Sequence, residues 1–156
     1  MSVPVTLKMT RQFRVPASPA RVFEVLADVP CSVSHFPKVR KLEDLGEGVY
    51  RWELEEIGAA GIRHEVVYAC RYISDMTAGS VEWTPIENIG NGQISGYWQI
   101  SGHEDGTQIE FRTDGRLQIP GPGLLAPIVA PVVREIFSGL IDEYIANLRQ
   151  TFQTRN

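Results

Sequence analysis

The sequence predicts an α+β fold in which a seven-stranded, curved antiparallel sheet wraps around a long C-terminal helix. Glycine-rich turns separate six runs of β-branched and aromatic residues, and a seventh alternating run stands alone near the N-terminus. Beyond residue 124 the alternation gives way to a helical periodicity. A sheet of this kind needs one face covered, and the last helix carries the only large apolar stripe that can cover it.

The first strand is predicted over residues 5–15, where apolar and polar side chains alternate with the period of a β-strand. A short helix follows, because Ser18 can cap its N-terminus and Pro19 suits the first helical position. A second short helix is predicted after Pro30. It should end at Phe36, since the proline that follows disfavours helical geometry in the residue before it.

The six remaining strands are predicted to form an antiparallel meander. Alternate side chains of a strand face opposite sides of the sheet, so the parity that carries the apolar residues is assigned to the inner face. The other parity holds most of the charged side chains and is expected to face water. Turns between the strands are predicted at residues 46–48, 58–61, 75–79, 87–92 and 103–106.

The C-terminal helix is predicted to be regular from about residue 131 to about residue 151. Its apolar side chains recur every three or four residues, at positions 125, 129, 132, 136, 140, 144, 148 and 152. An interior proline costs about 3 kcal/mol, so Pro127 and Pro131 are expected to kink the helix or to mark its first turn.

Length and composition indicate one domain that covers residues 1–156. Such a chain can bury a core without disulfides, and neither Cys31 nor Cys70 belongs to a CxxC pair. We therefore expect reduced thiols and a cytoplasmic protein without a signal peptide. The uncharged stretch over residues 117–133 contains four prolines and is shorter than the roughly 20 apolar residues of a spanning helix, so no integral membrane contact is expected.

Charge and motifs exclude several classes of function. Residues 43–110 carry thirteen acidic and three basic side chains, and this excess of negative charge repels the backbone of nucleic acids. The three histidines have no partner at metal-ligand spacing. The sequence also lacks a phosphate loop, a nucleotide fingerprint and a serine-nucleophile motif. We expect no metal, no cofactor and no nucleic-acid partner.

The inner parity of the meander predicts a concave face that is rich in aromatic rings. Such rings can form the wall of a pocket for a ring-containing or lipid-like ligand, or they can fill the core and leave no void. Val133 and Phe137 of the C-terminal helix are assigned to the same wall. The rings belong to Tyr50, Trp52, Tyr68, Tyr72, Trp83, Trp98 and Phe111.

Three polar side chains on the inner parity are candidates for chemistry. His64 falls on the same face as Tyr68, and either could exchange a proton with a ligand; His64 could equally be a core residue hydrogen-bonded to a neighbour. Arg11 interrupts the apolar pattern of the first strand. It could anchor an anionic head group, or lie with its stem on the core and its charge in water.

Four segments together resemble the helix-grip (START-like, SRPBCC) superfamily over about residues 5–152. They are residues 13–28, residues 35–39 (HFPKV), residues 96–100 (GYWQI) with Gly106 and Thr107, and the apolar C-terminal helix. The sequence is most similar to the polyketide cyclase/dehydrase and lipid-transport group. Residues 122–127 also resemble the branch of the superfamily that is named after a small component of carbon-monoxide dehydrogenase. The resemblance implies a START-like domain with a cavity between sheet and helix.

Three functions remain open from the sequence. The first is binding or transport of a small hydrophobic, aromatic or lipid-like molecule, by a monomer or a homodimer. The second is a cofactor-free polyketide cyclase or dehydratase that uses the same pocket. The third, which the resemblance implies, is an accessory interaction module of a larger enzyme complex. The predicted ligand-binding residues are Arg11, Tyr50, Trp52, His64, Tyr68, Trp83, Trp98, Phe111, Val133 and Phe137.

Overall fold

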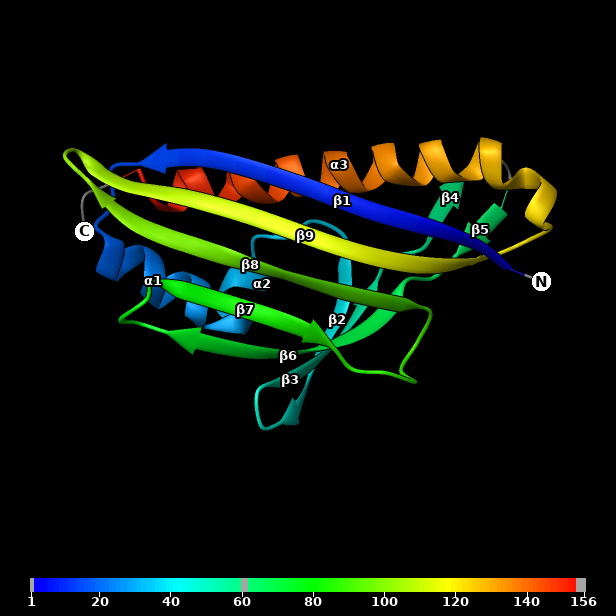
Figure 1. Ribbon diagram of the computed structural model, residues 1–156, viewed down its shortest axis with the longest axis horizontal. Helices are drawn as coiled ribbons and strands as arrows, with labels where there is room; N and C mark the ends of the chain where they lie inside the picture. The colour runs from blue at the N-terminus through cyan, green and yellow to red at the C-terminus, as the bar shows by residue number, and fades with distance from the viewer. Residues whose placement is uncertain (1, 60–61, 154–156) are drawn as a thin grey trace.

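The computed structural model describes residues 2–59 and 62–153, with side chains described outside residues 57–64. Seven strands form one antiparallel sheet in the order β1-β9-β8-β7-β6-β3-β2, and β4 pairs with β5 in a separate hairpin (Figure 1). The elements are β1 (Ser2–Val15), α1 (Pro19–Ala27), α2 (Val29–Val33), β2 (Val39–Gly46), β3 (Val49–Leu54), β4 (Ile57–Ala59), β5 (Ile62–His64), β6 (Val67–Asp75), β7 (Ser80–Pro85), β8 (Gly92–His103), β9 (Gly106–Pro120), the 3-10 turn η1 (Gly123–Leu125) and α3 (Ala126–Thr151). The sheet, the two short helices and the long last helix confirm the predicted fold class.

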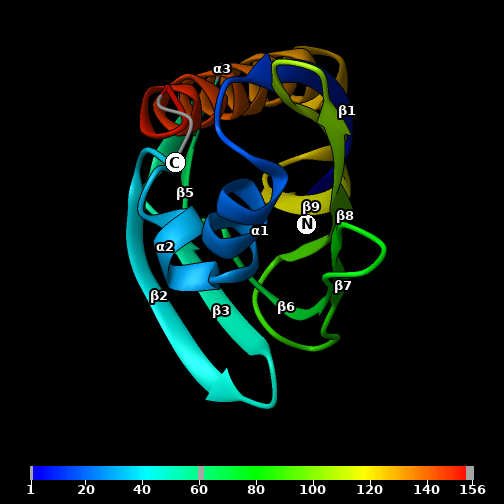
Figure 2. The same cartoon turned by 90° about the vertical axis from the view of Figure 1, so that its left-hand side faces the viewer.

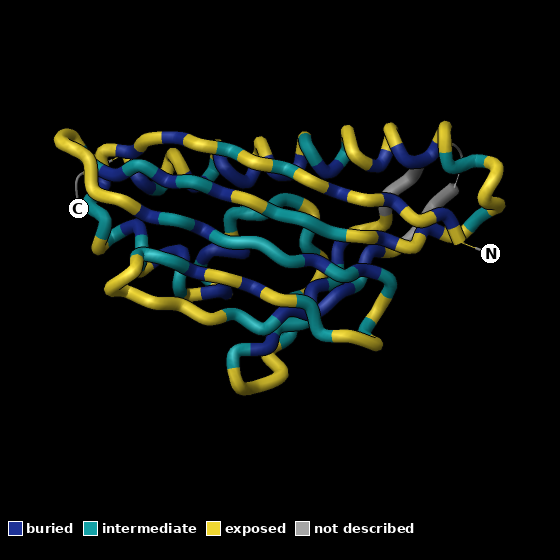
Figure 3. Tube along the Cα trace, viewed as in Figure 1, coloured by how far each residue is buried: buried dark blue, intermediate teal, exposed yellow. Residues whose placement is uncertain are grey.

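The sheet is curled into a trough, as Figure 2 shows along its length. α1 and α2 lie inside the trough, and α3 runs along its open side next to the edge strand β1 (Figure 2). Buried and exposed residues alternate along the strands (Figure 3), which is the period-two pattern that the sequence predicts. The buried parity faces the trough, so the core lies between the sheet and the three α-helices.

The local signals for α1 and α2 are satisfied in the structure. The Ser18 side chain accepts a hydrogen bond from the Arg21 N–H, and Pro19 begins α1. Asp28 caps α2 in the same way by accepting from the Cys31 N–H. α2 ends at Val33 instead of Phe36, and the chain continues as a turn in which the Phe36 N–H donates to the Val33 carbonyl at 2.8 Å.

The meander departs from prediction at the hairpin between β3 and β6. The Leu54 N–H donates to the Val66 carbonyl at 2.9 Å, and the ladder then breaks at the adjacent exposed residues Glu55 and Glu56. The chain pairs again as β4 and β5, which leave the main sheet and approach α3 (Figure 1). Two consecutive charged residues cannot continue an alternating apolar face, so the strands divide there.

α3 is continuous from Ala126 to Thr151, so it begins about five residues earlier than predicted. Pro127 occupies its first turn, where a missing N–H costs little, whereas Pro131 lies inside the helix. Val132, which the sequence pattern places on the inner stripe, is 37% exposed. The buried stripe consists of Val129, Ala130, Val133, Phe137, Leu140, Ile141, Tyr144, Ile145 and Leu148.

Polar contacts fix α3 parallel to β1 along its whole length. The Arg134 Nε donates to the Thr6 carbonyl at 2.9 Å near the start of the helix. The Arg11 guanidinium bonds to side chains in the middle of α3. Beyond the helix, the Ala17 N–H donates to the Phe152 carbonyl at 3.3 Å. The position of each turn of α3 relative to the sheet is thereby set.

Candidate functional site

A hollow of about 50 Å³ lies between the concave face of the sheet, the helices α1 and α2, and the C-terminal half of α3. Every layer of the fold contributes to its wall. Five of the predicted ligand-binding residues line it: Trp52, Tyr68, Trp83, Trp98 and Phe111. The other lining residues are Leu26, Val29, Ser32, Val33, Phe36, Tyr72, Val81, Ile94, Thr113, Ile141 and Tyr144.

The aromatic rings converge on the hollow and fill most of the space between the layers. Trp52 stacks on Tyr68 with ring centroids 5.5 Å apart. The Trp98 and Phe111 centroids are 4.6 Å apart, and the Trp83 ring contacts both. The remaining volume accommodates water-sized molecules but is far below the roughly 300–1,000 Å³ of drug-sized ligand pockets. Both interpretations of the aromatic face are therefore partly correct, because the rings converge and the space they leave is small.

Gly96 of β8 makes room for one of these rings. A Cβ atom at Gly96 would lie 2.7 Å from the nearest Trp83 ring atom and 2.2 Å from the Arg112 carbonyl oxygen. No side chain fits that space, so a glycine in the central strand lets the Trp83 ring lie against the sheet. The aromatic wall thus depends on a residue without a side chain.

Phe36 and Tyr144 close the hollow, although neither is among the predicted site residues. The Phe36 ring centroid lies 5.4 Å from that of Trp52 and 5.1 Å from that of Tyr144. Tyr144 belongs to the apolar stripe of the last helix, and that periodicity is the one signal that could have assigned it to the wall. Phe36 follows α2 in a turn, where no periodicity indicates the direction of a side chain.

Hydroxyl groups form the polar part of the hollow. The Ser32 Oγ and Tyr144 Oη atoms, both buried, are 2.5 Å apart in a short hydrogen bond. The Trp52 Nε1–H donates to the Tyr72 Oη at 2.9 Å. Among the described side chains, the Tyr68 hydroxyl makes no hydrogen bond although the residue is buried. A polar ligand atom in the hollow would therefore meet hydroxyl groups.

Burial keeps these groups uncharged. It raises the pKa of Tyr68 and of Tyr72 well above the usual value of a tyrosine, and the pKa of Tyr144 is raised for the same reason. Burial also raises the pKa of the Cys70 thiol to about 12. None of the residues that the structure describes brings a charged side chain to the wall of the hollow. The site therefore offers neutral hydrogen-bond donors within an apolar wall.

A larger groove of about 390 Å³ lies on the outer side of α2, against β2 and β3. Tyr50 lines this groove instead of the hollow, and burial together with Asp44 raises the pKa of its phenol. Val33 and Phe36 line both the groove and the hollow, so these two side chains stand between them. The other lining residues of the groove are Pro30, Ser34, Val39, Leu42 and Asp44.

Arg11 does not belong to the site. Its Nε donates to Asp142 Oδ1 at 2.8 Å and its Nη2 donates to Ser138 Oγ at 2.9 Å, both on α3. The prediction that Arg11 contacts a ligand is therefore wrong. α3 lies beside β1 and supplies a carboxylate at this position, 131 residues away in the sequence.

Three more predicted residues lie elsewhere or outside the described region. Val133 and Phe137 are buried on α3 but do not line the hollow, because the later turn that carries Ile141 and Tyr144 faces it. The backbone of His64 lies in β5 opposite Ile57, whereas Tyr68 lies in β6, so the strand that they were predicted to share is divided. The His64 side chain lies outside the described residues.

Comparisons with known proteins identify the fold. The family model for polyketide cyclase / dehydrase and lipid transport proteins matches residues 6–153. The Zhui aromatase/cyclase from Streptomyces sp. R1128 superposes with a TM-score of 0.62 at 19% identity, covering 95% of this chain and 92% of that one. A START superfamily protein from Mycobacterium smegmatis gives 0.68 at 13%, covering 94% and 97%.

A conserved protein from Geobacillus kaustophilus is similar to the same degree, with a TM-score of 0.68 at 15% identity over 96% of this chain and 95% of that one. No curated protein matches the sequence. Likeness at these identities shows the fold and not the chemistry. The START-like, helix-grip architecture inferred from the sequence is confirmed.

Proposed function

Because the chain belongs to the polyketide cyclase / dehydrase and lipid transport family, we propose that it binds a small, uncharged hydrophobic or aromatic molecule in the hollow. One observation carries this proposal. Aromatic rings from four strands surround a buried group of neutral hydroxyls, and this combination suits an apolar molecule with a carbonyl or hydroxyl group.

The small hollow requires that a side chain moves when the ligand enters, and Phe36 is best placed to do so. The groove on its outer side measures about 390 Å³, which lies in the usual size range of ligand pockets. Rotation of the Phe36 ring would join the groove to the hollow. Phe36 lies in a turn beyond the end of α2, so its ring can rotate without unfolding a helix.

α2 itself is held in place while Phe36 moves. The Ser32–Tyr144 bond connects it to α3, and the His35 Nε2 lies 2.7 Å from the Thr151 Oγ1. The Asn147 Nδ2 also donates to the His35 carbonyl at 2.9 Å. These three contacts join α2 and the turn after it to the C-terminal half of α3. We therefore assign the gating movement to the Phe36 side chain.

The wall of the hollow favours a neutral ligand. An anionic head group would lack a cationic partner there, since Arg11 is bonded to Asp142. Burial of apolar ligand surface contributes about 25 cal/mol per Å², from which the cost of ordering the ligand and the gate is subtracted. Orientation would come from the Tyr68 hydroxyl and from the Ser32–Tyr144 pair.

Ligand binding can be measured by thermal shift and tryptophan fluorescence with a panel of neutral quinones, polyphenols and lipids. We expect at least one class to raise the melting temperature and to quench the tryptophans of the wall. Ile141→Phe reduces the free volume and should weaken that binding about tenfold or more. A panel without any thermal shift would contradict the proposal.

The gate has its own test in stopped-flow kinetics. Phe36→Ala should raise both the association and the dissociation rate constant about tenfold or more, because the ring no longer obstructs the passage. Phe23→Ala is the matched control, since Phe23 is a partly buried aromatic residue of α1 that lines neither the hollow nor the groove. Equal rates in the two variants would remove Phe36 from the entry path.

A cofactor-free cyclase or dehydratase is the second candidate. The enclosed hydroxyl groups favour it, because a confined site can hold a flexible poly-ketone chain in one reactive conformation. The raised pKa values make the tyrosines poor proton donors to a substrate near neutral pH, which leaves His64 as the residue to test. His64→Ala should abolish turnover and preserve ligand binding; unchanged turnover would exclude this role.

The remaining expectations from the sequence are also proposals. We propose that residues 1–156 act as one domain in the cytoplasm, as a monomer or a homodimer. An accessory role in a larger enzyme complex is the third candidate, and size-exclusion chromatography with light scattering on the native protein distinguishes it from an isolated binding protein.

A further inference from the structure

The start of α3 and the turn before it expose apolar side chains on one face. Leu124 is 91% exposed, Ile128 is 56% exposed and Val132 is 37% exposed. They are four residues apart, and the exposed rings of Pro127 and Pro131 lie between them. Within the described chain these are three of the six exposed large hydrophobic residues. We call these five residues the apolar tip; Figure 3 shows the exposed segments at this end of α3.

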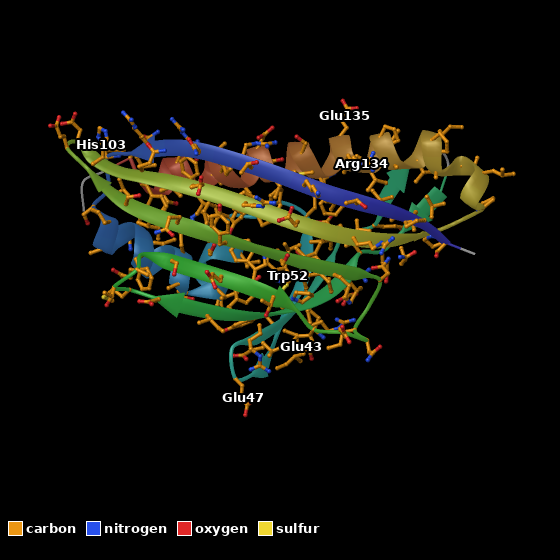
Figure 4. All side chains as sticks on the ribbon, in the orientation of Figure 1. Glu43, Glu47, Trp52, His103, Arg134 and Glu135 are labelled. Atoms are coloured by element: carbon orange, nitrogen blue, oxygen red, sulfur yellow. The ribbon has the colours of Figure 1, made fainter. Side chains whose placement is uncertain are left out.

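The charges around the apolar tip are positive. No charged residue occurs between positions 117 and 133, and the flanking charges are Arg116 and Arg134. Both arginines are exposed beside Thr6: Arg116 is its register partner in β9, and Arg134 donates to its carbonyl. Glu135 extends away from α3 into solvent (Figure 4). Neither arginine forms an ion pair with any acidic side chain that the structure describes.

This positive flank contrasts with the rest of the protein, whose net charge is −4. The backbone adds to the contrast, because the positive end of the α3 dipole lies at the apolar tip and no acidic side chain occurs in the first turn. Exposed apolar side chains beside unpaired cations are the pattern of a surface that binds anionic lipids.

The segment Gly123–Thr151 is long and apolar enough to span a bilayer by length and composition. Its opposite face, however, contributes Val129, Val133 and Phe137 to the core of the domain. Insertion across a membrane would remove these side chains from the sheet, whereas contact at the surface leaves the fold intact. A superficial position that uses only the exposed face is consistent with both observations.

We propose that the apolar tip docks the protein on an anionic phospholipid membrane, with Leu124 and Ile128 among the acyl chains and Arg116 and Arg134 at the phosphates. A second copy of the chain fits the same surface less well. A symmetric dimer through the tip would bring both pairs of arginines together, and like charges oppose such a contact. The docking surface lies at the opposite end of α3 from Tyr144, so it does not depend on the proposed ligand site.

Co-sedimentation with vesicles tests the docking. Vesicles of equal parts phosphatidylcholine and phosphatidylglycerol should bind the protein, and pure phosphatidylcholine vesicles should bind it much less. Leu124→Asp and Ile128→Asp should each lower the partition coefficient about tenfold or more, since an inserted aliphatic residue is replaced by a charge. The combined Arg116→Gln and Arg134→Gln variant should lose the preference for phosphatidylglycerol, as should the native protein at high salt.

Met76→Asp is the matched control, because Met76 is 77% exposed on the turn between β6 and β7, away from α3. It should bind vesicles as the native chain does. A Leu124→Trp variant should show a blue-shifted emission with vesicles and quenching by brominated phospholipid. Absence of native binding, or equal losses in Met76→Asp and Ile128→Asp, would overturn the proposal. So would a concentration-dependent dimer that Ile128→Asp abolishes, because it would assign the tip to self-association. Neither result would affect binding of a small molecule to the hollow.

Discussion

The two halves of α3 have similar apolar content and different environments. The C-terminal half is enclosed, with Ile141 and Tyr144 facing the hollow and α2 joined to it by hydrogen bonds. The N-terminal half lies beside β1 and near β4, and its outer face leaves Ile128 and Val132 in contact with water. One helix thus has a ligand-facing half and a surface-facing half.

The difference teaches that hydrophobic periodicity indicates a helix but not what each face contacts. Polar residues cover the outer face of the C-terminal half, where Asp142, Glu143 and Arg149 are exposed. In the N-terminal half, no charged residue precedes Arg134. Only the position of α1 and α2 inside the trough gives the two halves their separate roles.

The largest expected effect concerns the stability that each end contributes. Trp98 contacts the rings of Phe13, Trp83, Phe111 and Tyr144, so Trp98→Ala should lower the free energy of unfolding by about 3–5 kcal/mol. Ile128→Ala at the tip should change it by less than about 0.5 kcal/mol. Urea denaturation measures both, and equal losses would show that Ile128 is packed.

Pro131 sharpens the comparison within α3. Pro131→Ala restores a helical N–H at an exposed site, and should raise the free energy of unfolding by up to about 3 kcal/mol. Pro127→Ala is the control, because a first-turn proline costs little and its replacement should have almost no effect. Thermal denaturation of both variants gives the result. Equal shifts would mean that Pro131 imposes no cost on the helix.

The Ser32–Tyr144 hydrogen bond can be tested by a double-mutant cycle. Each of Ser32→Ala and Tyr144→Phe leaves a buried hydroxyl group without its partner and should cost about 1–3 kcal/mol. The double variant should be more stable than the sum of the two losses implies, because it removes both hydroxyls. Additive losses from denaturant unfolding would contradict a direct coupling of α2 to α3.

Alkaline pH should destabilise the aromatic end first. The folded state holds the protons of Tyr68, Tyr72 and Tyr144 above the usual tyrosine pKa, whereas the unfolded state releases them. The free energy of unfolding should therefore fall above about pH 10, by about 1.4 kcal/mol per pH unit for each group. Cys70 should add the same slope from about pH 9 up to its folded pKa of about 12.

Two variants assign these slopes. Tyr144→Phe should remove one tyrosine's share above about pH 10, and Cys70→Ala should remove the decline that begins near pH 9. Unfolding titrations at a series of pH values measure both. An unchanged slope in Tyr144→Phe would show that its phenol ionises as readily in the folded protein as in the unfolded chain.

Much of the site follows from the sequence because strand periodicity is a local property. Parity alone assigns Trp52, Trp83 and Trp98 to the inner face, and all three line the hollow. Phe36 cannot be assigned in this way, because the proline after it indicates only where helical geometry ends. The prediction for Arg11 is wrong because its partner Asp142 comes from another element, and a pattern within β1 contains no information on that contact.

The sequence by itself determined the order of the elements, the helix caps at Ser18 and Asp28, and the inward face of each strand of the meander. These features depend on residues a few positions apart. The tertiary structure alone decided that the rings nearly close the hollow, that Phe36 separates it from the groove, and that the start of α3 stays uncovered. A cavity is the small difference between large volumes contributed by distant segments, so only their final packing sets its size.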